Sequence, residues 1–226
     1  IFYKIDINQY KKLKKLYKKH LFHYVFHLAA QAGVRYSLIN PKVYIENNIS
    51  GFFNVLNLSL QFKVKRLFYA SSSSAYGDNS KFPLKENYIL TPKNIYGLSK
   101  KMNEEMTEVL LLKNKTKCIG LRFFTIYGEW GRPDMFMIKY LSATYNKSKV
   151  FYLNNYGNHF RDFTYIKDVC KILKKLIYLK IKYKHLIINI CSNKPLKLTS
   201  IIKKIDRLTL NKPKIKKISF QKSDIF

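Results

Sequence analysis

The chain has 226 residues, 47% of them hydrophobic and 15% aromatic, which is enough to bury the core of a folded α/β protein. No apolar run reaches the roughly 18 residues that a membrane span needs, and the opening residues show no secretion signal, so we expect a cytoplasmic protein without a membrane partner. The net charge of +30 could suit nucleic acid, but only six of the 43 basic residues are Arg and the Lys residues are spread along the whole chain, which argues against a nucleic-acid partner.

Cysteine and histidine residues give no sign of a disulfide framework or a metal site. Cys118, Cys170 and Cys191 are odd in number, far apart and form no C-x-x-C pair, so we expect them to be reduced. The five His residues lack the spacing of metal ligands, and we predict no metal.

The predicted elements alternate between strands and helices along the chain. We expect strands at 1–7 (the end of a strand only), 23–30, 64–71 and 117–124, short strands near 150 and 186, and helices at 10–20, 43–62, 94–112, 136–146, 165–180 and 197–208. Such alternation predicts right-handed βαβ units and therefore an α/β fold with a doubly wound parallel sheet. We assign residues 1–130 to this domain and 131–226 mainly to a smaller α/β substrate lobe, with an approximate boundary because the two interleave.

Polar and small residues follow the predicted strands at the points where the strands end. The segments are "LAAQAGVR" after the strand at 23–30, "SSSSAYG" after 64–71 and "TIYGEWGRPDM" after 117–124. Ligands of open parallel sheets bind at the carboxyl ends of the strands, so we expect the chemistry there.

Tyr96 and Lys100 are the first candidates for catalysis. They lie four residues apart in the predicted helix 94–112, so their side chains share one face. An ammonium group close to a phenol favours the phenolate, which can then act as a general base towards an alcohol. This pair alone is more often a solvated helix face, so its interpretation depends on the motifs around it.

Five motifs occur in order: "HLAAQAGVR", "YASSSSAYG", "YGLSK", "LRFFTIYGEWGRPDM" and "RDFTYIKDV". Together they resemble the extended short-chain dehydrogenase/reductase family of NAD-dependent epimerases and dehydratases, and within it the UDP-glucuronate 4-epimerases. The resemblance runs over the whole chain and implies a Rossmann-like fold, NAD as the cofactor, a UDP-sugar as the substrate and a homodimer.

The resemblance assigns roles to the residues that match these motifs. It makes Tyr96 the catalytic base, Lys100 its partner and a ligand of the nicotinamide ribose, and Ser72 the catalytic serine. Further residues expected to bind the cofactor are Asp6, Ile7, Leu28, Ala29, Ala30, Asn48 and Phe124. Residues expected to bind the substrate are Ser72, Ser73, Ser74, Arg35, Thr125, Arg132 and Arg161, with Thr125 and Arg132 at the hexuronate and Arg161 at the diphosphate.

The sequence departs from the family pattern at both ends. The glycine-rich turn that cradles the pyrophosphate in this family has no counterpart in the chain, which starts at the apparent end of the third strand. The last residues, "ISFQKSDIF", resemble a family segment that normally continues. We therefore expect an internal fragment or the product of a truncated gene, lacking the first βαβ unit and binding NAD poorly by itself.

The implied reaction is 4-epimerisation of UDP-glucuronate to UDP-galacturonate through a transient 4-keto sugar. Dehydratases that this family resembles carry Asp and Glu at the positions of Ser73 and Ser74, and decarboxylating relatives keep a Glu at the second position. Serine at both positions favours epimerisation, because a hydroxyl does not readily exchange protons with carbon at neutral pH. Two alternatives stay open. One is a related sugar-nucleotide enzyme, such as a 4,6-dehydratase, a decarboxylase or an epimerase that acts on UDP-glucose. The other is non-catalytic: a catalytically dead remnant or a basic binding protein on an old enzyme scaffold.

Overall fold

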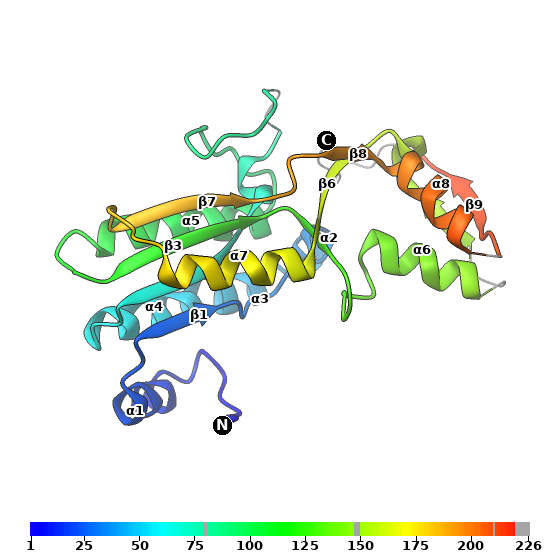
Figure 1. Ribbon diagram of the computed structural model, residues 1–226. Coiled ribbons are helices and arrows are strands. Elements are labelled where there is room, and N and C mark those ends of the chain that lie inside the picture. The colour runs from blue at the N-terminus through cyan, green and yellow to red at the C-terminus, as the bar shows by residue number, and fades with distance from the viewer. Residues whose placement is uncertain (79–80, 147–149, 210, 220–226) are drawn as a thin grey trace. The chain divides into compact units, whose positions relative to one another are not determined.

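The computed structural model describes residues 1–78, 81–146, 150–209 and 211–219 (Figure 1). The chain forms two compact units. The first contains Ile1–Phe123 and Lys175–Ile190, and the second contains Phe124–Lys174 and the chain from Cys191 onward. The chain therefore leaves the first unit after one strand and returns to it for another.

The first unit is built on a four-stranded sheet in which every neighbouring pair is parallel. Its order is β1 (Tyr24–His27), β2 (Arg66–Ser72), β3 (Lys117–Phe123) and β7 (His185–Ile190). The two central strands are almost wholly buried, as their unbroken apolar runs predict for strands with packed faces. The predicted α/β class with a parallel sheet is confirmed.

Helices of the first unit pack against the sheet. They are α1 (Tyr10–His20), α2 (Val34–Ile39), α3 (Pro41–Tyr44), the π-helical segment Ile45–Gly51, α4 (Phe52–Gln61), the 3₁₀ turn Ser73–Tyr76 and α5 (Ile95–Leu110). Figure 1 shows α4 and α5 behind the sheet, whereas the last turn of α7 (Ile166–Tyr178) lies in front. That last turn is tied to the sheet by Arg66, which donates hydrogen bonds to the carbonyls of Leu176 and Ile177 at 2.7 and 2.8 Å.

The core of the first unit lies between the sheet and these helices. Leu13 and Tyr17 of α1 and a row of α4 side chains pack there against the sheet. Phe52, Leu56 and Leu67 are completely buried, and at about 25 cal/mol per Å² such apolar burial is the main stabilising contribution.

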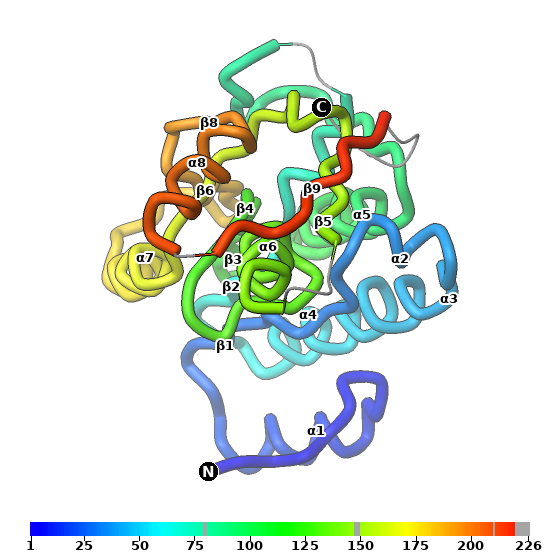
Figure 2. The backbone as a smooth tube through the Cα atoms, turned by 90° about the vertical axis from the view of Figure 1, so that its right-hand side faces the viewer, coloured from blue at the N-terminus to red at the C-terminus, as the bar shows by residue number. Residues whose placement is uncertain are grey.

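The second unit has short strands. β4 (Thr125–Tyr127), β6 (Phe160–Tyr165) and β8 (Pro195–Lys197) form one sheet, and β5 (Val150–Leu153) pairs with β9 (Lys214–Lys217), which runs beside it in Figure 2. Its helices are α6 (Phe136–Tyr145), α8 (Leu198–Leu208) and the first turns of α7, and a 3₁₀ turn covers Asn154–Gly157. Tyr140, Ala143, Phe151, Leu153 and Ile202 form its core.

One predicted element is wrong. Residues 1–7 form no strand: their backbone is irregular and enters a turn in which Gln9 N–H donates to the Asp6 carbonyl at 2.9 Å. A strand needs a neighbour to receive its backbone hydrogen bonds, and no described strand pairs with this segment. Ile5 and Ile7 pack instead against the core of the first unit.

Within the described part of the chain, no helix has the length and apolarity to cross a membrane.

Candidate active site

The beginning of α5 lies beside the carboxyl end of β2. Asn94 caps the helix by accepting a hydrogen bond from Gly97 N–H at 2.8 Å, which places Tyr96 in the first turn. A Cβ atom at Gly97 would lie only 2.4 Å from the carbonyl oxygen of Ser74. Glycine at this position therefore allows the helix to touch the serine turn that follows β2.

Lys100 stands one helical turn after Tyr96 and is buried. Its Nζ atom lies 5.9 Å from the centre of the Tyr96 ring and donates a hydrogen bond of 2.8 Å to the carbonyl of Ala70 in β2. Burial disfavours the ammonium form and lowers the pKa of Lys100 to about 8. Because Lys100 is buried against β2, the predicted pair lies on the face of α5 that is turned towards the sheet and not on a solvated face.

The serine cluster continues from β2 into the 3₁₀ turn. Ser72 is buried, and its Oγ atom accepts a hydrogen bond from Ser74 N–H at 3.1 Å. Ser73 and Ser74 are half-buried. Since Lys100 bonds Ala70 and Gly97 contacts Ser74, the three predicted catalytic residues Tyr96, Lys100 and Ser72 lie around one helix–strand junction.

The carboxyl end of β1 leads into an exposed segment that contains three of the predicted cofactor residues. Leu28, Ala29 and Ala30 are exposed and lie in the irregular segment directly after β1. His27, the last residue of β1, is buried. Burial, reinforced by the charge of Lys100, lowers the pKa of His27 to about 4 and keeps its imidazole neutral.

Asn48 joins this segment to α5. Its Oδ1 atom accepts from Gln31 N–H at 2.8 Å, and its Nδ2 atom donates to the Gln31 carbonyl at 2.9 Å and to Ser99 Oγ at 3.1 Å. Ser99 in turn donates to the Tyr96 carbonyl at 2.8 Å. The amide predicted to face the cofactor thus makes its described hydrogen bonds to the protein, and it lies in a π-helical segment, a form that is frequent at functional sites.

The remaining cofactor candidates of the first unit lie nearer its surface. Asp6 is exposed and accepts a hydrogen bond from Asn8 N–H at 2.8 Å, and Ile7 is half-buried, with its carbonyl accepting from Asn54 Nδ2 at 3.0 Å. The predicted substrate residue Arg35 is exposed on α2.

The other predicted residues belong to the second unit. Phe124 and Thr125 are half-buried at the start of that unit, and Arg161 is half-buried in β6, where it donates to the carbonyl of Phe160 at 2.7 Å. Arg132 is exposed, and its guanidinium group donates two hydrogen bonds, of 3.0 and 2.9 Å, to the carboxylate of Asp134. A carboxylate already occupies the fork that was predicted to hold one.

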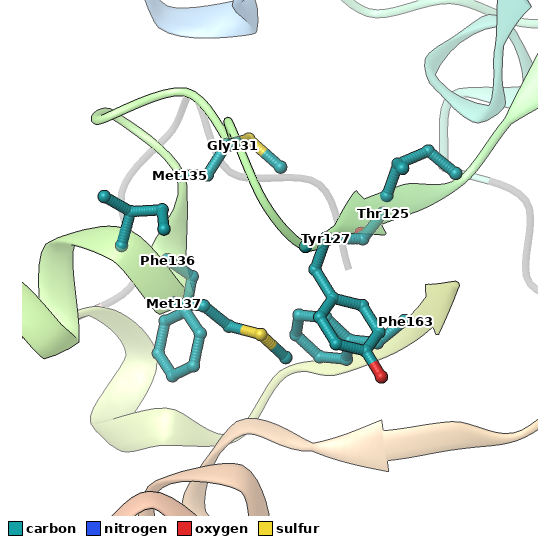
Figure 3. Close-up of a pocket in the computed structure, with 10 residues that line it drawn as sticks. Thr125, Tyr127, Gly131, Met135, Phe136, Met137 and Phe163 are labelled. Carbon is teal, nitrogen blue, oxygen red and sulfur yellow. The ribbon is translucent and has the colours of Figure 1, made fainter. Parts of the chain in front are cut away.

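Figure 3 shows a cavity in the second unit next to Thr125. Its lining is mostly apolar, with Tyr127, Met135, Phe136 and Phe163 around it. Its volume of about 30 Å³ is room for about one water molecule, so we regard it as a packing gap.

Sequence reasoning missed a buried ion pair next to this junction. Arg122 in β3 and Glu104 in α5 form a two-bond fork, and Ser71 donates to the same carboxylate at 2.5 Å. The helical spacing of Glu104, four residues after Lys100, was the available signal. Among the described residues, no three His, Cys, Asp or Glu side chains gather as a metal ion would require.

Comparison with known proteins gives a consistent result. Residues 1–191 match the NAD dependent epimerase/dehydratase family. Protein CapI of Staphylococcus aureus is 42% identical over 177 residues, which is 78% of this chain and 53% of CapI. A UDP-glucuronate 4-epimerase of Thermodesulfobacterium geofontis is 36% identical over 230 residues, which is 99% of this chain and 68% of that protein.

A solved structure described as MoeE5 in complex with UDP-glucuronic acid and NAD superposes with a TM-score of 0.91. It is 27% identical, and the match covers 99% of this chain and 73% of MoeE5. The chain thus spans between about half and three quarters of the length of these three proteins.

Proposed function

The chain belongs to the NAD-dependent epimerase/dehydratase family, and on that premise we propose that its protein is an NAD-dependent 4-epimerase that interconverts UDP-glucuronate and UDP-galacturonate. The observation that carries the proposal is the junction at which α5 sets Tyr96 one turn before the buried Lys100, against the strand end that bears Ser72. A relative named UDP-glucuronate 4-epimerase and the MoeE5 complex with UDP-glucuronic acid support the choice of substrate.

The described residues fit a dinucleotide at the end of β1. The exposed small residues Ala29 and Ala30 leave its backbone approachable, and Asn48 holds the following residue Gln31 in place through two backbone hydrogen bonds. NAD bound there would take up hydride from C4 of the sugar and return it to the opposite face.

The protein's own part in the reaction is proton transfer and orientation. Tyr96 removes the proton of the C4 hydroxyl as the carbon is oxidised and returns it when the carbon is reduced. The positive charge of Lys100 lowers the energy of the phenolate, and Ser72 hydrogen-bonds the same sugar hydroxyl. No net oxidation or reduction results, because each proton and hydride that leaves the sugar comes back to it.

Residues of the second unit would recognise the sugar nucleotide. We assign the hexuronate carboxylate to Arg132, whose planar fork holds Asp134 in the free protein and would have to exchange that side chain for the carboxylate of the sugar. Thr125 is assigned to the same sugar and Arg161 to the diphosphate. Arg35, a residue of the first unit, remains a further candidate for binding the substrate.

Ser73 and Ser74 decide the reaction type within this proposal. Both are half-buried hydroxyls in the turn after β2, where an acid or base for elimination would have to be a carboxylate. A 4-keto sugar held here can therefore be reduced again but is not assisted in losing water or carbon dioxide.

The test is the product formed from UDP-glucuronate by the full-length protein with a catalytic amount of NAD. We expect UDP-galacturonate alone, identified by proton NMR of the sugar. A UDP-pentose would indicate decarboxylation, and a 4-keto-6-deoxy sugar from UDP-glucose would indicate dehydration; either product would refute the proposal.

A further inference from the structure

Two neighbouring turns of α5 hold two consecutive residues of β2. Lys100 Nζ donates to the carbonyl of Ala70 at 2.8 Å, and Ser71 Oγ donates to Glu104 Oε1 at 2.5 Å. Lys100 and Glu104 are four residues apart, as are Tyr96 and Lys100, so all three project from one face of the helix. The helix is therefore fixed against the strand at two points along its axis.

The second of these points, the contact of Ser71 with Glu104, is reinforced by an ion pair. Arg122 in β3 donates from Nε to Glu104 Oε1 at 2.9 Å and from a terminal nitrogen to Oε2 at 2.6 Å. The side chains of Arg122 and Glu104 are only 4% and 7% exposed. Burial by itself would lower the pKa of Arg122, but the hydrogen bonds and charge of Glu104 outweigh it and raise that pKa, so the guanidinium stays charged.

Arg122 is itself held from the other side. Its remaining terminal nitrogen donates to the Tyr76 hydroxyl at 2.8 Å and to the Glu86 carbonyl at 3.0 Å, and its guanidinium lies 4.7 Å from the centre of the Tyr76 ring. Tyr76 donates in turn to Asn189 in β7 at 2.8 Å. Arg122 is therefore held by groups outside α5, and it offers the carboxylate of Glu104 a partner that is anchored independently of the helix.

We propose that Glu104, clamped by Arg122, is a positioning residue that fixes the register of α5 along β2 through Ser71 and thereby places Tyr96 relative to Ser72. The inference rests on the proposed function, because it assigns Glu104 a role in the geometry of that same reaction. Its physical basis is the steep dependence of proton transfer on geometry, since a misplacement of about 1 Å can cost about 100-fold in rate. Neither Glu104 nor Ser71 is assigned any contact with substrate or cofactor.

Ser71→Ala tests the link with the least disturbance. It removes the hydroxyl between the strand and Glu104 but leaves the two-bond pair of Glu104 with Arg122 intact. Glu105→Gln is the matched control, because Glu105 is the next residue on α5, is exposed and pairs only loosely with Lys101 at 3.6 Å. With UDP-glucuronate and NAD, Ser71→Ala in the full-length protein should lower kcat at least about 10-fold with KM for both ligands unchanged, and Glu105→Gln should change neither.

A second readout does not depend on turnover. The Cζ resonance of Tyr96 in protein labelled with ¹³C-tyrosine, assigned by its loss in Tyr96→Phe, reports the surroundings and titration of that phenol. We expect the resonance and its titration midpoint to move in Ser71→Ala and to stay in place in Glu105→Gln. If the Tyr96 resonance is the same in wild type and Ser71→Ala, the positioning role is refuted.

The two readouts separate this inference from the proposed function. A Tyr96 resonance that moves as expected, in a protein that does not turn over UDP-glucuronate, would refute the epimerase and leave the positioning role standing. If the protein is an active epimerase and Ser71→Ala leaves its kcat unchanged, the positioning role is refuted and the epimerase stands.

Discussion

Replacing Arg122 by Met should destabilise the first unit severely. Met keeps the apolar stem of the side chain but removes both hydrogen bonds to Glu104, at 2.9 and 2.6 Å, from a site where the carboxyl side chain is 7% exposed. Ser71 is then the remaining donor to a buried carboxylate. Leaving one partner of such a pair without its counter-charge costs about 3–5 kcal/mol, a large part of the 5–15 kcal/mol that stabilises a typical domain.

Urea unfolding at pH 7, followed by far-ultraviolet circular dichroism, measures this loss. Arg207→Met on the exposed face of α8 is the control and should stay within about 0.5 kcal/mol of wild type. Adding Glu104→Gln to Arg122→Met should recover more than about 0.5 kcal/mol, because the uncompensated charge is gone. A loss below about 1 kcal/mol in Arg122→Met, or no recovery in the double variant, would show that the pair is not the buried, mutually dependent unit described above.

Four further changes test the site. Tyr96→Phe should lower kcat by about 100-fold or more with little change in KM for UDP-glucuronate, and unchanged turnover would move the base elsewhere. Arg132→Ala should weaken binding of UDP-glucuronate by about 1.5–3 kcal/mol in calorimetric titration while sparing UDP-glucose; equal losses for both sugars would make this arginine structural. The pKa of Lys100 is about 8 in the folded protein and near 10.5 in the unfolded chain, so the unfolded chain binds more protons between pH 8 and 10.5. The free energy of unfolding should therefore rise with pH through that window. Lys100→Met should flatten the rise when urea unfolding is measured at several pH values. The pKa of His27 is about 4 when folded and near 6.5 when unfolded, so stability should fall as pH drops from 6.5 to 4, and His27→Gln should remove that part of the decline in the same assay.

Elements with long apolar runs could be predicted from sequence, and so could the short strand β5 near residue 150, but other short strands could not. The strands expected at 64–71 and 117–124 are β2 and β3, and the helix expected at 43–62 is a continuous helical stretch that contains the π-helical segment. Strands of three or four residues such as β4, β8 and β9 are too short to show a period, and every residue of β9 is exposed. Residues 1–7 have strand-like composition, but composition cannot reveal whether a neighbouring strand is present.

The site could be predicted only as far as motifs name residues. Tyr96, Lys100 and Ser72 were placed by their motifs, and the helix–strand junction brings them into one region, while their catalytic roles remain predictions. The family resemblance gave Asn48 a role beside the cofactor but could not show that its amide bonds Gln31 and Ser99, because partners distant in sequence are set by the fold. The ion pair of Asp134 with Arg132 was also invisible, although the two residues are close in sequence, because a charged pair in a loop has no periodicity to orient it.

Glu104 and Glu105 show what a helical position adds to a residue type. They are adjacent and chemically identical, yet the Glu104 side chain is 7% exposed and the Glu105 side chain 64%. They differ in their position around the helix axis. Lys100, which is paired with Tyr96, faces the sheet, and Glu104, four residues later, lies on the same face of the helix. A carboxylate predicted at a sheet-facing position requires a buried cation, and a parallel strand offers one wherever an arginine interrupts its apolar run, as Arg122 interrupts "KCIGLRFF". Counting one helical turn on from Lys100 therefore identifies Glu104, whose buried pair with Arg122 joins the helix to the sheet.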